Sequence, residues 1–181
     1  MARAYWQRAI VFSFLFVAAC ASLTQAECQQ ANWFEIGQND GAQGRTLAIF
    51  KDHVKSCQKA NVIPDRREYE DGRNFGLARY CTPLSGFKAG RYSQTYQNVC
   101  PPETQGEFIK GYELGGQFGQ VEKQLFEVNQ DIDDIEGSLR KDKIKPDQKE
   151  SLYKQVDRLR DEKDRLEREI QRIQTVADQT L

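Results

Sequence analysis

The chain has 181 residues, of which 29% are charged and 39% are hydrophobic, and its formal net charge is −1. This balance and a mean hydropathy of −0.74 exclude a protein with many membrane spans and a strongly basic nucleic-acid-binding protein. The sequence contains no motif with catalytic spacing, so it names no biochemical activity. It does indicate where the protein is directed and how it is held together.

The first 19 residues resemble an export signal. Arg3 and Arg8 give the beginning of the chain a positive charge, and an apolar run follows at residues 9–19. As a helix this run spans only about 16 Å, roughly half of the apolar core of a bilayer. We therefore expect a signal peptide over residues 1–19 rather than a transmembrane anchor.

Two cleavage sites compete in this region. Residues 17–20, Val-Ala-Ala-Cys, resemble the bacterial lipobox, in which Cys20 is lipidated and becomes the new N-terminus. Residues 24–26 resemble an ordinary signal-peptidase site with cleavage after Ala26. Either cleavage leaves an even number of cysteines that can form disulfides, so the cysteine count does not distinguish between the two cleavage sites. We expect lipidation of Cys20. Because Ala21 rather than Asp follows it, we expect the protein to be anchored in the outer membrane and to face the periplasm. The alternative is a soluble periplasmic or secreted protein.

Removal of the signal also changes the charge. Arg3 and Arg8 are lost, and the remaining chain has more acidic than basic side chains. We therefore expect no positive surface that would bind nucleic acid or anionic lipid.

Helix-start signals predict an all-α protein. Four times a Thr or Asp is followed three residues later by Glu, as in a capping box: Thr24/Glu27, Asp65/Glu68, Thr104/Glu107 and Asp147/Glu150. Prolines fall between the predicted segments, where they do least damage to a helix. The expected helices cover about residues 25–41, 46–58, 66–81, 105–143 and 148–178, with an irregular stretch before residue 103.

The last third of the chain has the apolar spacing of a coiled coil. Apolar side chains recur alternately three and four positions apart through residues 121–139 and 152–177, which gives each helix a narrow seam for one partner. Pro146 marks a short connection, so we expect an antiparallel coiled-coil hairpin, residues 120–181, after a compact helical head, residues 20–119. A single exposed helix or a coiled coil between chains is the alternative.

The head repeats a pattern of an aromatic residue followed by glycines. It occurs at Trp33, Gly37, Gly41 and Gly44, at Tyr69, Gly72 and Gly76, and at Phe108, Gly111, Gly115 and Gly119. Spacings of three and four place the glycines on one helix face, where each costs roughly 0.5–1 kcal/mol relative to alanine. We expect the close approach of another backbone or ring to offset this cost. The alternative is that the glycines mark turns, above all at Gly41 and Gly44.

The four cysteines after Cys20 are expected to form two disulfides, because exported proteins are usually oxidised. If the first two predicted helices form an antiparallel hairpin that turns near residues 42–44, Cys28 and Cys57 face each other at the distance that a disulfide requires. The remaining pair is then Cys81–Cys100, for which the chain has to loop back through a segment with glycine and proline.

The framework of cysteine, glycine and aromatic residues resembles a family of exported bacterial lipoproteins known as the domain of unknown function 2799. The resemblance covers roughly residues 28–119 and rests on Cys28, Trp33, Gly37, Asp40, Gly41, Gly44, Cys57, Tyr69, Gly72, Gly76, Leu77, Tyr80, Cys81, Gly90, Tyr96, Cys100, Phe108, Gly111 and Gly115. It implies a lipidated cysteine shortly before the first framework cysteine, in agreement with Cys20. It implies no activity, and the arm lies outside it.

The sequence contains no convincing cofactor or metal motif. His53 is the only histidine, and its neighbours predict a half-exposed position on a helix. The cysteines are too far apart for a zinc site, and residues 131–137 resemble a calcium loop only faintly, because the glycine falls one place late. We therefore expect no cofactor and assign no catalytic residue.

The sequence thus predicts a non-enzymatic cell-envelope lipoprotein that acts as a structural or protein-interaction module. The expected partners are the membrane, through the lipid anchor, and a protein of the envelope. One alternative is a periplasmic module that binds a glycan or peptide on exposed aromatic rings, with Trp33, Tyr69, Tyr92, Tyr96 and Tyr112 as candidates. Exposed rings would favour that alternative, and buried rings would favour packing. An enzyme of unrecognised type is a further alternative.

Overall fold

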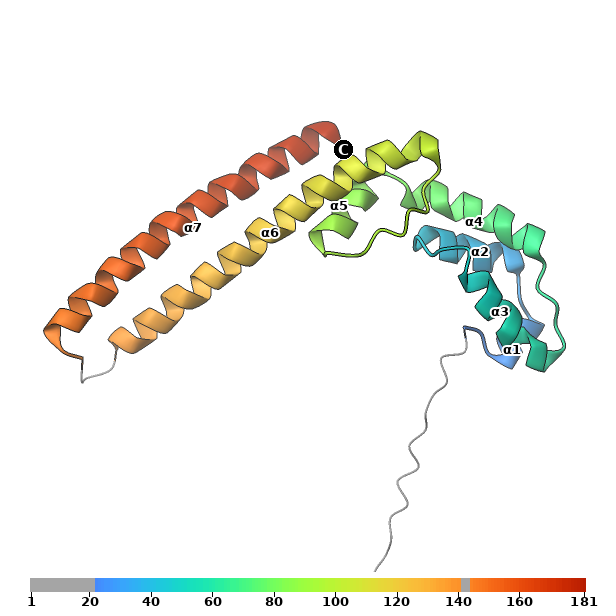
Figure 1. Cartoon of the computed structure of the whole chain (residues 1–181), viewed down its shortest axis with the longest axis horizontal. Coiled ribbons are helices and arrows are strands. Elements are labelled where there is room, and N and C mark those ends of the chain that lie inside the picture. Colours follow the sequence, from blue (N-terminus) through green and yellow to red (C-terminus); the bar gives the residue numbers. More distant parts are fainter. Residues whose placement is uncertain (1–21, 141–143) are drawn as a thin grey trace, which may run out of the picture.

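The computed structural model describes residues 22–140 and 144–181, in which all regular structure is helical. One end contains α1 (Gln25–Gln29), α2 (Trp33–Ala42), α3 (Ile49–Cys57), the short 3-10 helix η1 (Gln58–Ala60), α4 (Arg66–Tyr80) and α5 (Pro83–Arg91). Two long helices, α6 (Pro102–Leu139) and α7 (Pro146–Thr180), extend to the other end of an elongated molecule (Figure 1). The expected signal peptide and Cys20 lie outside the described residues.

Two of the four expected capping signals begin helices. The Thr24 hydroxyl accepts a hydrogen bond from the Glu27 amide, and the Glu27 carboxylate accepts one from the Thr24 amide, which completes a capping box. Asp65 accepts hydrogen bonds from two amides at the start of α4. The long helices begin instead at Pro102 and Pro146, ahead of the other two signals. Proline is favoured there because a first-turn residue needs no amide partner within the helix.

Two predicted segments differ from the structure. The helix expected over residues 25–41 is two helices, because Asn32 interrupts it and accepts a hydrogen bond from the Glu35 amide at the start of α2. The stretch expected to be irregular contains α5, which Thr82 caps. Two glycines lower the helix propensity of α5, and its packing against α6 overrides that preference.

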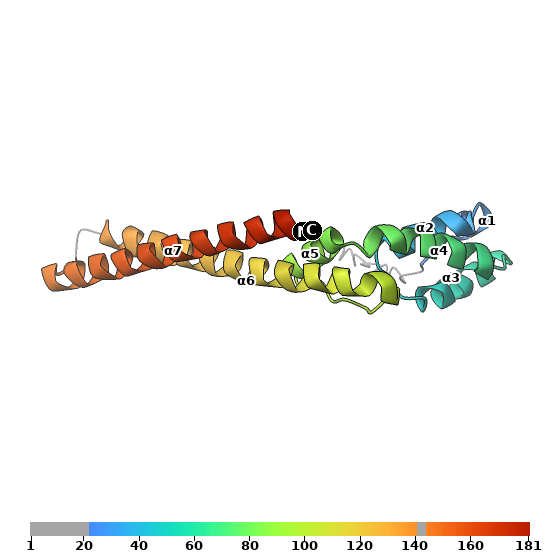
Figure 2. The same cartoon turned by 90° about the horizontal axis from the view of Figure 1, so that it is seen from above.

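The helices α2 and α4 approach so closely that their contact has glycine at four positions. A Cβ atom built on Gly37 or Gly41 would overlap a carbonyl oxygen of α4, and one on Gly72 or Gly76 would overlap a carbonyl oxygen of α2. The two helices lie side by side in both views (Figure 1, Figure 2). This backbone contact, rather than the expected hairpin of the first two helices, organises the N-terminal end.

The helices α5 and α6 repeat the same contact. Gly86 and Gly90 of α5 lie against carbonyl oxygens of α6, and Gly111 and Gly115 of α6 lie against carbonyl oxygens of α5. The expectation of close backbone approach is therefore confirmed at these positions. Among the glycines of the described residues, Gly44 has a left-handed backbone, with a φ of 66°, and it marks the turn after α2.

The two helix pairs are repeats of one structural unit. We call the segment from α1 to α4, built on the pair of α2 and α4, the first unit, and the segment from α5 to the first half of α6 the second unit. Each first helix is followed by a residue with positive φ, Gly44 in one unit and Ser93 in the other, with the same backbone hydrogen bonds around it. Each second helix buries a fully enclosed ring beside its glycines, Tyr69 in α4 and Phe108 in α6.

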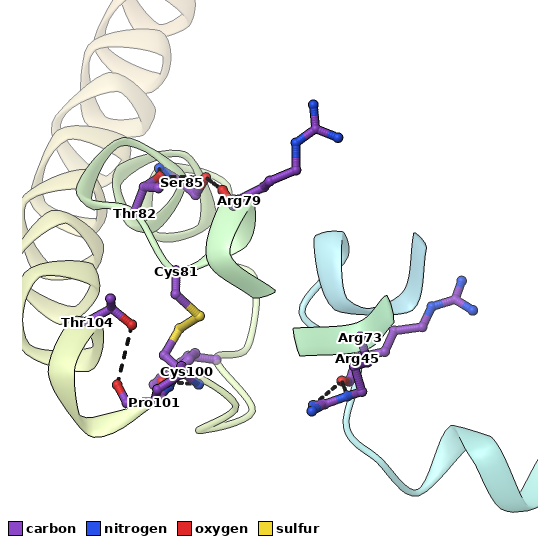
Figure 3. The surroundings of a disulfide bond; sticks show 10 residues. Arg45, Arg73, Arg79, Cys81, Thr82, Ser85, Cys100, Pro101 and Thr104 are labelled. Atoms are coloured by element: carbon purple, nitrogen blue, oxygen red, sulfur yellow. Dashed lines mark hydrogen bonds between the residues drawn. A yellow bond between two sulfur atoms is a disulfide. The ribbon is translucent and has the colours of Figure 1, made fainter. Parts of the chain in front are cut away.

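A disulfide closes each unit, and the pairs are those expected from the sequence. Cys28–Cys57 links α1 to the end of α3, with 5.4 Å between the Cα atoms, and Cys81–Cys100 has a separation of 5.5 Å. Figure 3 shows the second disulfide, where the end of α4, the start of α5 and the start of α6 meet. In the chain-entropy model, loops of this length stabilise the fold by about 3 kcal/mol each.

The arm consists of α7 and the second half of α6, which lie side by side and run in opposite directions (Figure 1, Figure 2). The side chains buried between them follow the expected seam and include Val128, Ile132, Val156 and Leu166. Because α6 is one continuous helix, the expected boundary at residues 119 and 120 falls inside it. The second unit and the arm therefore share a single rigid element.

Candidate functional site

The first unit contains a buried carboxylate, that of Asp40. Asp40 lies on α2 beside Gly41, on the side that packs against α4, and only 4% of it is exposed. Its Oδ2 atom accepts hydrogen bonds from the Tyr69 hydroxyl at 2.8 Å and from His53 Nε2 at 2.8 Å. Its Oδ1 atom accepts one from Arg45 at 3.2 Å. The carboxylate is thereby paired on both oxygens inside the core.

His53 connects this carboxylate to the N-terminal segment. The sequence predicts a half-exposed histidine, which is wrong, because only 2% of His53 is exposed. An ionised carboxylate only accepts hydrogen bonds, so Nε2 donates to Asp40. In the neutral ring Nδ1 then accepts from the Ser22 hydroxyl at 3.0 Å, and Ser22 lies 3.1 Å from the Ser56 hydroxyl. One chain of hydrogen bonds thus joins α2, α3 and the N-terminal segment.

The surroundings set the ionisation of the two acids in this network. Burial alone would raise the pKa of Asp40, but hydrogen bonds from His53 and Tyr69 and the charge of Arg45 hold that pKa below its ordinary value. Burial, and then the hydrogen bond to Asp40, raise the pKa of Tyr69 well above its ordinary value. At neutral pH the network therefore contains an ionised carboxylate and a neutral phenol.

The second unit indicates that helix pairs of this geometry do not need these polar groups. Ala89 takes the position of Asp40 there, and Phe108 takes the position of Tyr69, and both are buried. The glycine contacts around these positions are the same in the two units. Buried polar groups cost free energy unless they are paired, so a network that the packing does not need indicates a role specific to the first unit.

None of the expectations from the sequence included this network, although the residue spacing contains a signal for it. Asp40 lies three positions after Gly37 and one before Gly41, so it shares the packed face of its helix. His53 lies three positions after Phe50 and four before Cys57, and both of those are buried. A polar residue between buried positions at helical spacing predicts a buried hydrogen bond.

A groove of about 810 Å³ lies beside the network, between the N-terminal segment and α3. Its lining combines hydroxyl groups, cations and a carboxylate: Ser22, Thr24, Ser56, Arg45, Lys55, Lys59 and Asp52. Two of these hydroxyl groups, on Ser22 and Ser56, belong to the hydrogen-bond chain that leads to Asp40. The site therefore combines a buried acid–imidazole pair with a groove whose lining contains more cations than acids.

The five aromatic residues expected to form a stacking surface do not form one. Trp33 and Tyr69 are buried in the first unit, and Tyr96 and Tyr112 are half-buried in the second. Tyr92, which is 67% exposed, is the single exposed member of the set. The rings beside the glycines fill the core, because a glycine on the facing helix leaves room for them.

The chemistry open to this site is hydrogen bonding within the network and binding of an anion in the groove. Within residues 22–140 and 144–181, His, Cys, Asp and Glu side chains form no group arranged to hold a metal ion. Over the same residues, no helix combines the length and the apolar composition that are needed to cross a membrane.

The comparison with known families matches the two units. Residues 32–117 match the family model described as "Protein of unknown function (DUF2799)". The match begins at the N-cap of α2 and ends within α6, so it contains Asp40, His53 and Tyr69. Neither a curated protein nor a solved structure matches the chain. Residues 32–117, which span most of these two units, belong to the DUF2799 family of proteins of unknown function.

Proposed function

We propose that the protein is a non-enzymatic lipoprotein of the cell envelope, anchored through Cys20, that acts as a structural or protein-interaction module. The observation that carries the proposal is the attachment of the N-terminal segment to the first unit. Ser22, two residues after Cys20, is hydrogen-bonded to the buried His53. Lipid on Cys20 would hold this unit at the bilayer surface. The two disulfides support an oxidising compartment.

The contacts of the N-terminal segment favour cleavage before Cys20 over cleavage after Ala26. Cleavage after Ala26 would remove the Ser22 hydroxyl from His53 Nδ1 and the Thr24 cap from α1. A buried hydrogen-bonding group that loses its partner costs about 1–3 kcal/mol, and a lost N-cap costs about 1 kcal/mol. Residues 22–24 thus contribute to the folded head and are poor candidates for a discarded signal.

The arm offers the surface for an envelope partner. We interpret α6 and α7 as an antiparallel coiled coil, because their buried side chains recur at the spacing of a seam. The helix α7 has 35 residues and is therefore about 52 Å long. The ends of α6 and α7 that are joined in sequence lie far from α1 (Figure 1). An anchor at one end and an exposed helix pair at the other suit a tethered spacer that presents a contact surface.

Metabolic labelling with a palmitate analogue, together with mass spectrometry of the mature N-terminus, tests the anchor. We expect label on the wild-type chain and none on Cys20→Ser. The matched control Thr24→Ala keeps the lipobox and is expected to keep the label. A mature N-terminus at Glu27, or unchanged labelling of Cys20→Ser, would refute the anchor.

The partner is tested separately with a photocrosslinker on the exposed face of α7. We expect a probe at Tyr153 or Arg158 to capture an envelope protein in intact cells, because both side chains face solvent on the arm. The same probe at the exposed Gln97 of the second unit serves as the control. Equal capture from Gln97 and from α7 would contradict a contact surface on the arm.

A second candidate function, acyl transfer, has one observation in its favour. The order Ser22, His53, Asp40 is the hydrogen-bonded order of a serine nucleophile, its base and the orienting carboxylate. The Ser22 hydroxyl is also shared with Ser56, which suits a structural attachment equally well. Labelling with a fluorophosphonate probe separates the two functions. A reactive nucleophile is labelled in the wild type and unlabelled in Ser22→Ala and His53→Gln, whereas a structural serine is unlabelled in all three.

A further inference from the structure

We propose that the groove between the N-terminal segment and α3 binds the phosphate group of an anionic phospholipid at the surface of the membrane. The inference rests on the lipid anchoring proposed above and adds the surface with which the head would contact the bilayer. The groove is lined by Ser22, Arg45, Asp52, Lys55, Ser56 and Lys59. Other residues of the N-terminal segment and the first residues of α1 and α3 complete the lining.

The charge of the groove is positive, although the chain as a whole is slightly acidic. Lys55 and Lys59 are exposed and lie four positions apart, so their side chains are neighbours along α3 and η1. Arg45 also lines the groove, but its charge is paired with that of the ionised Asp40. Asp52 is the acid in the lining. Lys55 and Lys59 thus outnumber Asp52 in the lining, a local excess of positive charge that the net charge of the whole chain does not reveal.

A second carboxylate nearby is already engaged. The Glu27 side chain of α1 accepts hydrogen bonds from the amide and the hydroxyl of Thr24, at 2.7 and 2.8 Å. It is thereby held in the helix cap. Glu27 does not line the groove, and Asp52 is the acid that does.

The position of the groove selects a lipid rather than a soluble anion. Ser22 lines the groove and follows Cys20 by two residues, which at full extension span about 7 Å. Electrostatic attraction to an anionic surface extends over about 8 Å at physiological ionic strength. A lipid on Cys20 would therefore hold the lysines within range of the phosphates of neighbouring lipids.

The buried network explains why the groove keeps its shape. His53 holds Ser22 at the edge of the groove, and Asp40 holds His53. The second unit has neither these polar residues nor a helix at the position of α3. The network, α3 and the basic groove thus occur together, in the unit that follows the anchor.

The test is vesicle co-sedimentation of the oxidised chain from residue 20 onward, with Cys20→Ser so that no covalent lipid contributes. We expect binding to vesicles that contain phosphatidylglycerol and far weaker binding to phosphatidylcholine alone. Loss of one surface lysine weakens such binding about fivefold, so Lys55→Glu with Lys59→Glu should weaken it at least about 30-fold. The control Lys149→Glu with Arg158→Glu makes the same change of charge on α7 and should leave binding nearly unchanged.

Equal weakening by the two double variants would overturn the proposal, as would equal binding to both kinds of vesicle. Displacement of the Cys20→Ser chain from vesicles by millimolar inorganic phosphate would show a site for soluble phosphate instead. Lys55→Gln with Lys59→Gln guards against misfolding, and disulfide mapping verifies the fold of each variant. Labelling of Cys20 is measured independently: missing label with intact vesicle binding overturns the anchor alone, and label without vesicle binding overturns the groove alone.

Discussion

Gly115 and Gly116 are adjacent in α6, and the structure predicts opposite effects when each is replaced by alanine. A Cβ on Gly115 would overlap the carbonyl oxygen of Phe87 and lie 2.7 Å from its carbonyl carbon, whereas a Cβ on Gly116 has no neighbouring atom within 4 Å. Alanine is favoured over glycine inside a helix by about 0.5–1 kcal/mol. At position 116 this gain should appear in full. At position 115, α5 and α6 have to separate, which costs about 1–3 kcal/mol or more.

For a chain of this size, 1 kcal/mol corresponds to about 2–4 °C in Tm. We therefore expect Gly116→Ala to raise the Tm by about 1–4 °C and Gly115→Ala to lower it by about 2–12 °C. Thermal melts followed by far-UV circular dichroism, with the disulfides kept oxidised, measure both. Gly76→Ala should behave like Gly115→Ala, because it meets the carbonyl oxygen of Gln38 in the first unit. Shifts of the same sign at 115 and 116 would refute the backbone-contact explanation of the glycines.

The remaining predictions concern the buried network, the arm and the disulfides. The pKa of Asp40 is lower in the folded chain than in the unfolded chain, so the ionised carboxylate stabilises the fold at pH values above the unfolded pKa of about 3.9. This stabilisation is lost as the pH falls through the folded pKa. In melts at a series of pH values, Asp40→Asn should abolish this loss of stability at acid pH. The pKa of Tyr69 is raised in the folded chain, so its contribution to the stability of the fold is complete below about pH 10 and is lost as the pH rises further. Tyr69→Phe should remove this loss of stability at alkaline pH. Leu166→Asp places a charge in the buried seam, and limited proteolysis should then cut α7 while the disulfide-linked head resists; a resistant α7 would contradict the pairing of α6 and α7. Peptide mapping without reduction should recover the disulfides Cys28–Cys57 and Cys81–Cys100. Any other pairing of these four cysteines would contradict the fold.

Local signals were sufficient for the helical class but not for the layout around the cysteines. The capping box at Thr24 and the cap at Asp65 depend on residues a few positions apart, and both are present in the structure. The pair Cys28–Cys57 was expected from a hairpin of the first two helices, and the structure contains this pair in a different layout. Cys28 reaches Cys57 because α1 lies beside α3, while α2 packs along α4.

Non-local packing could not be predicted from local preference. The helix α5 was missed because glycine destabilises an isolated helix, and the compensating contact comes from α6. The Asp40 network was missed for a related reason. Its hydrogen bonds join residues 13 and 29 positions apart, and each partner read alone resembles a solvated or turn residue. The spacing predicts burial of such residues only after the packed face of the helix has been identified.

The two units carry their polar groups at opposite ends of the connected head. In the first unit the network meets the N-terminal segment, whereas in the second unit Arg91 of α5 donates two hydrogen bonds to Glu122 of α6, at 2.6 and 2.8 Å. The Arg91 guanidinium also lies 4.8 Å from the ring centre of Phe118, which fixes its direction. A guanidinium that donates two hydrogen bonds to one carboxylate fixes the relative orientation of the two side chains more strictly than an apolar contact does. Since α6 continues without a break into the arm, this pair holds the base of the arm as the network holds the N-terminal segment, and glycine-packed helices join the two.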